Sequence, residues 1–315
     1  MTTNLIIYVG APEGYEAVQD VMHCFGKTEH VPALQKTIES HLEQATALLD
    51  ASMKVRISDG MVRSAPELRV ISCATTGSDH IERAELNRRK IPVHTLREDP
   101  ELLQNITPAA ELSWALVLAS ARRLAPALMH TAGGQWNREE FPGLMLNGRQ
   151  LGLIGCGRIG GWMSRYGHAF GMNVVGYDPH IDPWPAGIER LTIEQVFETS
   201  DVISIHVHLS EETRGLVSPD LIQRVKRGAI LINTSRGGIA DETSILRALE
   251  SGQLGAAGLD VLEGEPDIGD HPLVAYARKH DNLLITPHCG GFSPDAVRRV
   301  CHRAAEKILP YLDND

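Results

Sequence analysis

The sequence predicts an α/β protein with two parallel sheets, of which the larger is doubly wound. The chain has 315 residues, which is more than one hydrophobic core usually serves, so we expect two domains. Short apolar runs alternate with helical stretches along the chain, a pattern typical of parallel sheets with crossover helices. A glycine motif directly follows one of these runs, at residues 151–160.

The first hundred residues predict the smaller α/β domain. Their apolar runs have the length of short strands and lie at residues 4–9, 45–49, 69–73 and 91–94. Polar or helical stretches separate these runs. We therefore expect a flavodoxin-like parallel sheet, with residues 1–103 as the first segment of this domain.

The glycine motif, LGLIGCGRIG at residues 151–160, predicts a dinucleotide site. Leu151–Ile154 has the character of a buried strand. The glycines that follow supply a tight turn, close approach of the backbone to a pyrophosphate, and close helix–strand packing; they are Gly155, Gly157 and Gly160. A helix beginning at Arg158 would direct the N–H groups near Ile159 and Gly160 at the phosphates.

An acidic residue at the expected spacing strengthens this interpretation. The apolar run Asn173–Tyr177 delivers Asp178 eighteen residues after Gly160, in place to bind the diol of an adenosine ribose. A carboxylate there would repel a 2′-phosphate. The expected cofactor is therefore NAD rather than NADP.

The remaining pattern predicts a Rossmann domain over residues 104–287. Thr107–Leu124 is a helix that is apolar on nearly every face, so we expect it to be buried between domains or subunits. Later strands bring the sheet to six; they are predicted at Val202–Val207, Ala229–Asn233, Ala256–Leu259 and Asn282–Ile285, with helices at Pro219–Arg224 and Glu242–Leu249. The last helix, Pro294–Leu312, leaves this domain, so residues 288–315 are expected to return to the first.

Titratable side chains follow the last three strands, at the edge where ligands of such sheets bind. Arg236 could clamp a carboxylate, His288 could transfer a proton near neutral pH, and a carboxylate at Glu265 could orient the histidine. Each feature alone has an ordinary explanation as a surface charge, a turn or an incidental histidine. Their joint presence beside a dinucleotide motif indicates reduction of a 2-oxo acid. Glu263 competes with Glu265 as the partner of His288.

These motifs, together with CATTGSDHI at residues 73–81 and HVHLSEETRG at residues 206–215, resemble the D-isomer-specific 2-hydroxyacid dehydrogenases. The resemblance covers nearly the whole chain. It implies an NAD-dependent enzyme that interconverts a D-2-hydroxy acid and a 2-oxo acid. The substrate would be of the glyoxylate or hydroxypyruvate kind, or phosphoglycerate.

The resemblance also implies roles for individual residues. Arg236 would bind the substrate carboxylate and carbonyl, and His288 would be the acid/base. Glu265 would support His288, and we prefer it to Glu263 because it directly precedes Pro266, as in the family's Glu-Pro pair. Asp260 resembles the residue that holds the nicotinamide carboxamide. The cofactor site would further include His206, Thr213 and Thr234, and the substrate site would include Ala74, Thr75, Thr76, Gly77 and Asn105.

Two departures from the family pattern bear on the substrate and on local packing. The Arg-Ser pair that binds phosphate in phosphoglycerate enzymes is replaced by Asp50-Ala-Ser52-Met53, and Asp50 would oppose a phosphate, although Lys54 and Arg56 lie nearby. His208 stands where the family usually has proline.

An alternative function is an NAD(H)-sensing binding protein of the corepressor type, which the absence of long disordered flanks disfavours.

Composition narrows the partners and the compartment. A formal net charge of −10, with no long Lys/Arg run, argues against nucleic acid or an anionic membrane as partner. No signal peptide or membrane span is apparent, and five scattered cysteines outside any zinc spacing suit a reducing cytoplasm without a bound metal. We expect a homodimer formed through the coenzyme domains, because the apolar Thr107–Leu124 helix and the Trp136 loop need cover.

Overall fold

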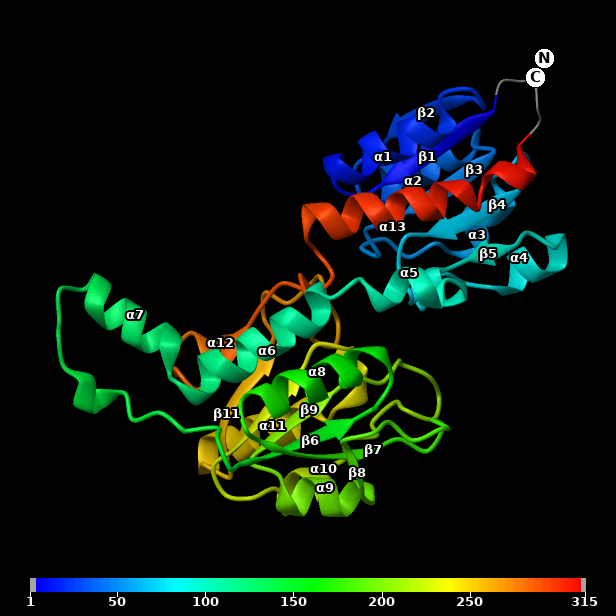
Figure 1. Ribbon diagram of the computed structural model, residues 1–315. Helices are drawn as coiled ribbons and strands as arrows, with labels where there is room; N and C mark the ends of the chain where they lie inside the picture. Colours follow the sequence, from blue (N-terminus) through cyan, green and yellow to red (C-terminus); the bar gives the residue numbers. More distant parts are fainter. Residues whose placement is uncertain (1–3, 313–315) are drawn as a thin grey trace. The chain divides into compact units, whose positions relative to one another are not determined.

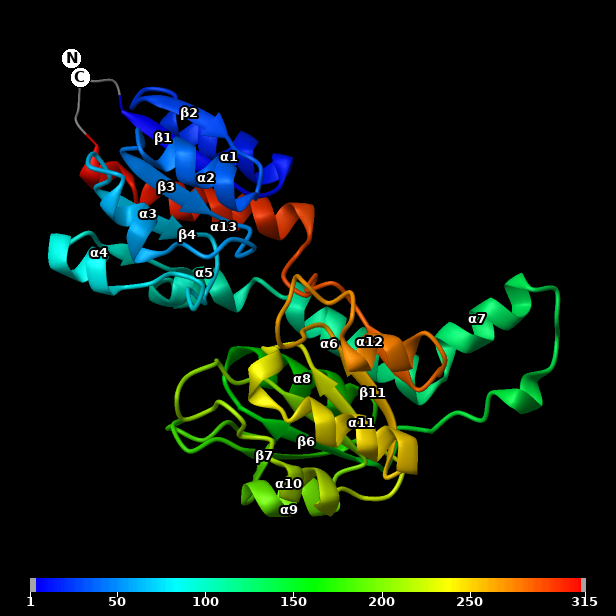
Figure 2. The same cartoon turned by 180° about the vertical axis from the view of Figure 1, so that it is seen from behind.

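The computed structural model describes residues 4–312 and divides into two compact units. The first unit combines Met1–Ile106 with Phe292–Asp315, and the second unit is Thr107–Gly291. Figures 1 and 2 show both from opposite sides. Each unit is a parallel sheet with helices on both faces, so the α/β class is confirmed.

The sheet of the first unit has five parallel strands in the order β2-β1-β3-β4-β5. This is the flavodoxin-like order, in which the switch point for ligands lies beside β1 and β3. The strands are β1 (Leu5–Val9), β2 (Lys27–His30), β3 (Ala47–Asp50), β4 (Val70–Cys73) and β5 (Val93–His94). The helices are α1 (Pro12–Met22), α2 (Gln35–Leu42), α3 (Asp59–Arg63), α4 (Ala84–Arg89), α5 (Pro100–Gln104) and α13 (Pro294–Glu306), with short 3₁₀ turns at Leu96–Glu98 and Leu309–Tyr311.

Both faces of this sheet are buried, which explains the unbroken apolar run of β1. Alternate residues of a strand point to opposite faces. Ile6 and Tyr8 accordingly pack with α1 and α13, whereas Ile7 and Val9 pack with α2, α3 and α4. Helix α13 is therefore part of the first unit's core, and Figure 1 shows it alongside the sheet.

The second unit has seven parallel strands in the order β12-β11-β10-β9-β6-β7-β8. From β6 the chain adds β7 and β8 on one side of the sheet, and then adds β9 to β12 on the other side of β6, as in a Rossmann fold. The strands are β6 (Gln150–Ile154), β7 (Asn173–Tyr177), β8 (Glu189–Arg190), β9 (Val202–Ile205), β10 (Ala229–Asn233), β11 (Leu254–Leu259) and β12 (Leu283–Ile285). The helices are α6 (Pro108–Ala121), α7 (Leu124–Ala132), α8 (Arg158–Ala169), α9 (Ile193–Thr199), α10 (Pro219–Arg224), α11 (Glu242–Ser251) and α12 (Pro272–Ala277), with 3₁₀ turns at Arg138–Glu140 and Gly237–Ile239.

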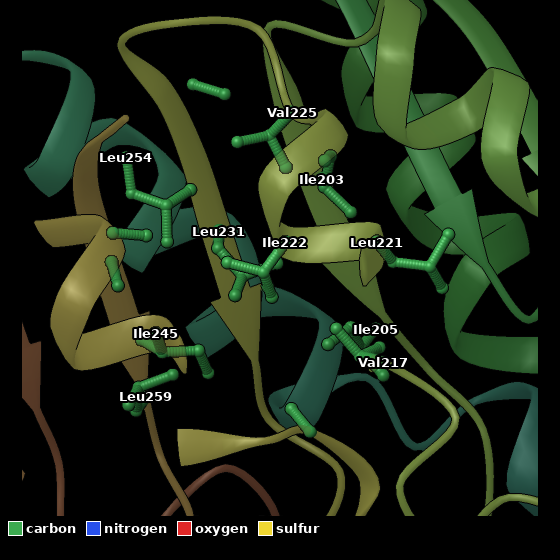
Figure 3. Packing of buried hydrophobic residues seen from close by; sticks show 14 of the residues in the cluster. Ile203, Ile205, Val217, Leu221, Ile222, Val225, Leu231, Ile245, Leu254 and Leu259 are labelled. Carbon is green, nitrogen blue, oxygen red and sulfur yellow. The ribbon is translucent and has the colours of Figure 1, made fainter. Parts of the chain in front are cut away.

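Two apolar layers hold the second unit together. One face of its sheet packs against α9–α12, and Figure 3 shows Leu231 of β10 among Ile222 of α10 and Ile245 of α11. The opposite face packs against α6 and α8, where Trp114 and Met163 are buried. Burying both faces leaves only the strand ends and edges for ligands.

Two strands and two helix ends differ from the sequence expectation. The prediction missed β2 (KTEH) and β8 because both are polar edge strands, exposed or partly exposed, without an apolar run. The first sheet therefore has five strands where four were expected, and the second has seven where six were expected. The helix predicted to reach Leu124 ends at Ala121, since Arg123 adopts a left-handed φ of 49° before α7 begins. Similarly, the last helix ends at Glu306 and continues as a 3₁₀ turn.

Helix α6 lies beside α8 on one face of the second sheet, where it packs on β10 and β11 and half of its residues are buried. By contrast, α7 contains no buried residue although its sequence, LAPALMHTA, is mostly apolar. Across residues 4–312, no helix combines the length and apolar character that crossing a bilayer requires.

Candidate active site at the carboxyl edge of the second sheet

The carboxyl ends of the parallel strands in the second unit collect most of the predicted site residues at one edge. Asp178 follows β7, His206 follows β9, and Asp260 follows β11 directly. Arg236 and His288 each come three residues after the end of β10 and β12. Because β10, β11 and β12 are neighbours, their loops lie side by side at this edge.

The glycine turn after β6 has the form that a pyrophosphate requires. Gly155 has a φ of +91°, and a Cβ there would lie 2.6 Å from the carbonyl oxygen of His206. A Cβ on Gly160 would lie 2.2 Å from the Gly155 carbonyl oxygen, so this glycine permits close packing of α8. A Cβ on Gly157 would meet no protein atom within 4 Å. That open space at the N-terminus of α8 fits a phosphate held by backbone N–H groups.

Asp178 is tied to the same turn. Its Oδ2 accepts a hydrogen bond from the Cys156 backbone N at 3.0 Å, and its Oδ1 accepts one from the His180 backbone N at 2.9 Å. The side chain is half-buried. The carboxylate therefore has a fixed position at the end of β7, where a ribose diol would meet it.

His206 lies directly beside the glycine turn, where its backbone N donates to the Ile154 carbonyl oxygen at 2.7 Å. Neither of its ring nitrogens has a hydrogen-bond partner, and burial lowers the pKa of His206 to about 3. The ring is therefore neutral at physiological pH. In the loop that follows, Thr213 Oγ1 donates to the His208 carbonyl oxygen at 2.5 Å and accepts from the Ser210 backbone N at 2.8 Å, closing a tight turn.

Arg236 is presented by a loop that Asn233 organises. The Asn233 side chain donates to the Arg236 carbonyl oxygen at 2.9 Å and accepts from the Ser235 backbone N at 3.0 Å. The Thr234 hydroxyl lies 2.7 Å from the Ser113 hydroxyl of α6. This loop is held from both sides, and the half-buried Arg236 donates from Nη1 to the Ser235 carbonyl oxygen at 2.7 Å.

Asp260 is almost fully buried, with 1% of its surface exposed, and it anchors the loop that carries His288. Its Oδ1 accepts from Thr286 Oγ1 at 2.5 Å and from the Cys289 backbone N at 2.9 Å, while its Oδ2 accepts from the Gly290 backbone N at 2.7 Å. His288 itself has a left-handed φ of 52°. Such a conformation is uncommon outside glycine and persists where surrounding contacts enforce it.

The catalytic candidates His288 and Glu265 are in direct contact. His288 Nδ1 lies 2.5 Å from Glu265 Oε1, with each side chain about one-third exposed. Glu263 instead approaches Arg214, at 3.7 Å, and is largely exposed. Glu265 thus fixes the imidazole with Nδ1 as the donor, which leaves Nε2 as the nitrogen for proton exchange with a substrate.

Two further residues at this edge, Glu242 and His271, were not predicted from the sequence. Glu242 Oε1 accepts from the Glu263 backbone N at 2.8 Å, and Glu242 Oε2 lies 2.9 Å from His271 Nε2. Glu242 looked like an ordinary acidic residue in the first turn of a helix. The His-Pro pair before α12 signals a helix start, but no spacing rule connects it with a residue 29 positions earlier.

The predicted substrate-binding residues belong to the first unit. Ala74–Gly77 follow β4, where Thr75 Oγ1 donates to the Gly77 carbonyl oxygen at 2.7 Å and the Ala74 backbone N donates to the Asp50 carbonyl oxygen at 2.9 Å. Asn105 caps the end of α5, and its carbonyl oxygen accepts from Arg299. The loop after β4 therefore lies at the carboxyl edge of its own sheet, beside the end of β3.

Comparison with known proteins identifies the family. The model of the D-isomer specific 2-hydroxyacid dehydrogenase NAD binding domain matches residues 114–290. The chain belongs to the D-isomer specific 2-hydroxyacid dehydrogenases. This 2-hydroxyacid dehydrogenase is an NAD-dependent oxidoreductase with the two-domain fold of the family.

Relatives and a solved structure cover nearly all of this 2-hydroxyacid dehydrogenase. A glyoxylate reductase of Korarchaeum cryptofilum is 33% identical over 90% of this chain and 84% of its own. A hydroxypyruvate reductase of Thermotoga maritima is 32% identical over 97% of this chain and 98% of its own. The TT0316 protein of Thermus thermophilus superimposes with a TM-score of 0.85 at 32% identity, over 97% of this chain and 96% of its own.

The chain spans about half the length of a third relative. A D-3-phosphoglycerate dehydrogenase of Bacillus subtilis is 31% identical over 90% of this chain but only 53% of its own. Within residues 4–312, no group of three or more His, Cys, Asp or Glu side chains is arranged to hold a metal ion.

Proposed function

We propose that the enzyme reduces a short 2-oxo acid of the glyoxylate or hydroxypyruvate kind to its D-2-hydroxy acid. The contact between His288 Nδ1 and Glu265 Oε1 carries this proposal, because it orients an imidazole at the cofactor edge of the sheet. NAD, when bound, supplies or accepts the hydride. The residues of this chain then have to hold the acid, move one proton and place the cofactor.

Each residue at the edge has a step that its chemistry suits. The Arg236 guanidinium pairs with the substrate carboxylate and polarises the carbonyl oxygen. His288 begins as imidazolium and gives its Nε2 proton to that oxygen as C2 receives the hydride. Glu265 stabilises the charged ring through Nδ1. In the reverse direction neutral His288 takes the hydroxyl proton, so charge and protons balance both ways.

The remaining site residues are proposed to place the cofactor and the acid. Backbone N–H groups around Arg158, Ile159 and Gly160 would hold the pyrophosphate, and Asp178 the ribose diol. The neighbouring wall would come from His206, Thr213 and Thr234, and the nicotinamide carboxamide would lie near Asp260. In the first unit, Ala74, Thr75, Thr76, Gly77 and Asn105 would bind the substrate.

The side-chain end of the substrate is proposed to be small and without phosphate. Asp50, 3% exposed at the end of β3, has its Oδ2 2.6 Å from His80 Nε2. Its Oδ1 accepts from the backbone N and the hydroxyl of Ser52. A buried carboxylate at this strand end disfavours a phosphate nearby. The two near full-length relatives also support the smaller acids over phosphoglycerate, which remains the second candidate.

The test measures kcat/KM against pH in both directions, for the wild type and Glu265→Gln. The acids are glyoxylate, hydroxypyruvate, pyruvate and 3-phosphohydroxypyruvate. Reduction should decrease as pH rises because it needs the imidazolium form of His288, whereas oxidation should increase because it needs the neutral ring. Glu265→Gln should move both midpoints acidward, because the imidazolium loses its anionic partner.

Two results would contradict this assignment. If the Glu265→Gln midpoints coincide with the wild-type ones, Glu265 is not the partner of the acid/base. If 3-phosphohydroxypyruvate is turned over best, the exclusion of phosphate by Asp50 is wrong.

We also propose that the enzyme is a cytoplasmic homodimer. Five cysteines scattered along the chain suit a reducing compartment. The exposed apolar side chains of α7 and the segment after it support association of two copies.

A further inference from the structure

Glu242 and His271 of the second unit form a contact between two ionisable side chains that is more enclosed than the proposed catalytic pair. Their side chains are only 14% and 15% exposed, and Oε2 of Glu242 lies 2.9 Å from Nε2 of His271. His271 Nδ1 accepts from the Leu273 backbone N at 3.2 Å, so Nε2 must carry the proton and donate it to Glu242. The tautomer of His271 and the direction of its hydrogen bond to Glu242 are therefore both defined.

The second oxygen of Glu242 holds one peptide of the loop that carries Glu265. Oε1 accepts from the Glu263 backbone N at 2.8 Å. The preceding backbone N, of Leu262, donates to Glu265 Oε2 at 3.3 Å. Two successive backbone N–H groups of this segment thus bind two carboxylates: the one of Glu263 donates to Glu242, and the one of Leu262 donates to Glu265. The other oxygen of Glu265, Oε1, contacts His288.

The Arg236 loop rests on that same peptide. A Cβ built on Gly237 would lie 2.2 Å from the Glu263 backbone N and 2.2 Å from the Leu262 carbonyl carbon. No side chain fits there, so the backbone next to Arg236 is in direct contact with the peptide that Glu242 holds. The hydrogen bond from Glu263 to Glu242 therefore affects two of the three loops with proposed catalytic side chains, those of Glu265 and Arg236.

We infer that Glu242 and His271 are positioning residues that fix the Leu262–Glu263 peptide and through it align Glu265, His288 and Arg236. This inference rests on the proposed function, because it concerns the same acid/base pair. Glu242 must be ionised to accept both donors. Burial raises the pKa of Glu242, and the hydrogen bonds from Glu263 and His271 oppose that rise. The charged groups that face Glu242 are His271, from the start of α12, and Glu263, which has Arg214 beyond it.

The experiment is a double-mutant cycle read as a pH profile. It measures kcat/KM for 2-oxo acid reduction against pH in the wild type, Glu242→Ala, Glu265→Gln and the double variant. Glu242→Ala should shift the midpoint acidward, by less than Glu265→Gln does, and raise the KM for the oxo acid through the Arg236 loop. The loss in kcat/KM should be roughly 2- to 160-fold, the range that corresponds to the interaction energies of coupled neighbours. In the Glu265→Gln background, Glu242→Ala should give no further shift.

A milder variant and a matched control separate positioning from folding. His271→Asn keeps a side chain able to cap α12 but too short to reach Glu242, so it should reproduce the shift in smaller measure. Glu198→Gln removes a carboxylate from an exposed ion pair with Arg224, 2.7 Å away in the same unit, and should leave midpoint and KM unchanged. NADH affinity should be unaltered in all these variants.

The outcomes distinguish this inference from the proposed function. If Glu242→Ala and His271→Asn lower only the melting temperature, with midpoint and KM as in the wild type, the positioning role is overturned. A shift from Glu242→Ala that persists in the Glu265→Gln background also overturns it. If Glu265→Gln itself leaves the midpoint unmoved, the acid/base assignment fails and this inference fails with it.

Discussion

Two aspartates at strand ends on the same edge of the second sheet show how burial separates the roles of like residues. Asp260 is buried and satisfies its charge with donors from Thr286, Cys289 and Gly290, as a buried carboxylate must. Asp178 uses only two backbone donors and stays half-exposed. Asp260 is thus built to hold a loop, whereas Asp178 keeps capacity for an external hydroxyl.

Asp178 should determine the choice of cofactor. Removing its charge by Asp178→Asn should relax the preference for NADH over NADPH by roughly 10- to 100-fold, about 1–3 kcal/mol. Asp178→Ala should additionally weaken NADH binding, because the Cys156 backbone N of the glycine turn loses its acceptor. The ratio of kcat/KM for the two cofactors measures this preference. A wild type that uses NADPH as well as NADH would contradict the assignment.

His288 and Arg236 should fail in different ways. His288→Ala removes proton transfer, so kcat should fall on the order of 10²–10⁴-fold while NADH binding is kept. Arg236→Ala should raise the KM for the oxo acid and also lower kcat, since the guanidinium both holds the acid and polarises its carbonyl. Steady-state kinetics with a separate NADH titration resolves the two patterns. Near-normal turnover in His288→Ala would mean that another group delivers the proton.

At the scale of elements, the sequence predicted best where burial is uniform. Apolar strands such as β6 and β10 have every interior position buried, so their runs are visible in the sequence. The edge strands β2 and β8 owe their existence to one neighbouring strand each, which leaves no apolar signature. The same limit applies to the site. The contact of His288 with Glu265 agrees with the preference drawn from the Glu-Pro pair, whereas Glu242 and His271 meet only through tertiary structure.

Helix α13 should depend on one buried acidic group. Asp99, whose side chain is 7% exposed, contacts Lys307 and accepts from Arg303 Nε at 2.6 Å. Burial alone would raise the pKa of Asp99, but these two cations hold it below its usual value. The stabilisation is therefore complete above the unfolded-state value near 3.9 and is lost as pH falls through the lower folded-state value.

Asp99→Asn should reduce the free energy of unfolding by about 1–3 kcal/mol at pH 7, because the buried Lys307 ammonium loses one of its two carboxylate partners and keeps only the more exposed Glu98. The difference from wild type should shrink in acid. Denaturant unfolding at several pH values measures both effects. Glu16→Gln, in an exposed pair with Arg298 of the same helix, is the control and should cost at most about 0.5 kcal/mol. An equal loss in both variants would contradict the role of burial.

At the scale of the whole molecule, the second unit leaves an apolar segment without cover. Helix α7 and the chain after it, residues 124–145, follow directly on the buried helix α6. Met129 is 73% exposed, Trp136 91% and Met145 73%. Side chains of this kind on a soluble surface mark a contact site, and Figure 1 shows α7 extending away from the sheet of its unit. Among the described α-helices, α7 alone contains no buried residue.

We therefore expect the protein to form a homodimer in which each copy covers residues 124–145 of the other. Sedimentation at micromolar concentration should give about twice the 34.5 kDa mass of one chain. Met129→Glu combined with Trp136→Glu should shift the mass toward one chain, because burying two new charges in the interface costs more than the contact gains. Glu139→Gln, in the exposed pair with Arg138 on the same segment, should leave the mass unchanged. A wild-type mass of one chain would contradict the dimer, and an unaltered dimer in the double variant would place the interface elsewhere.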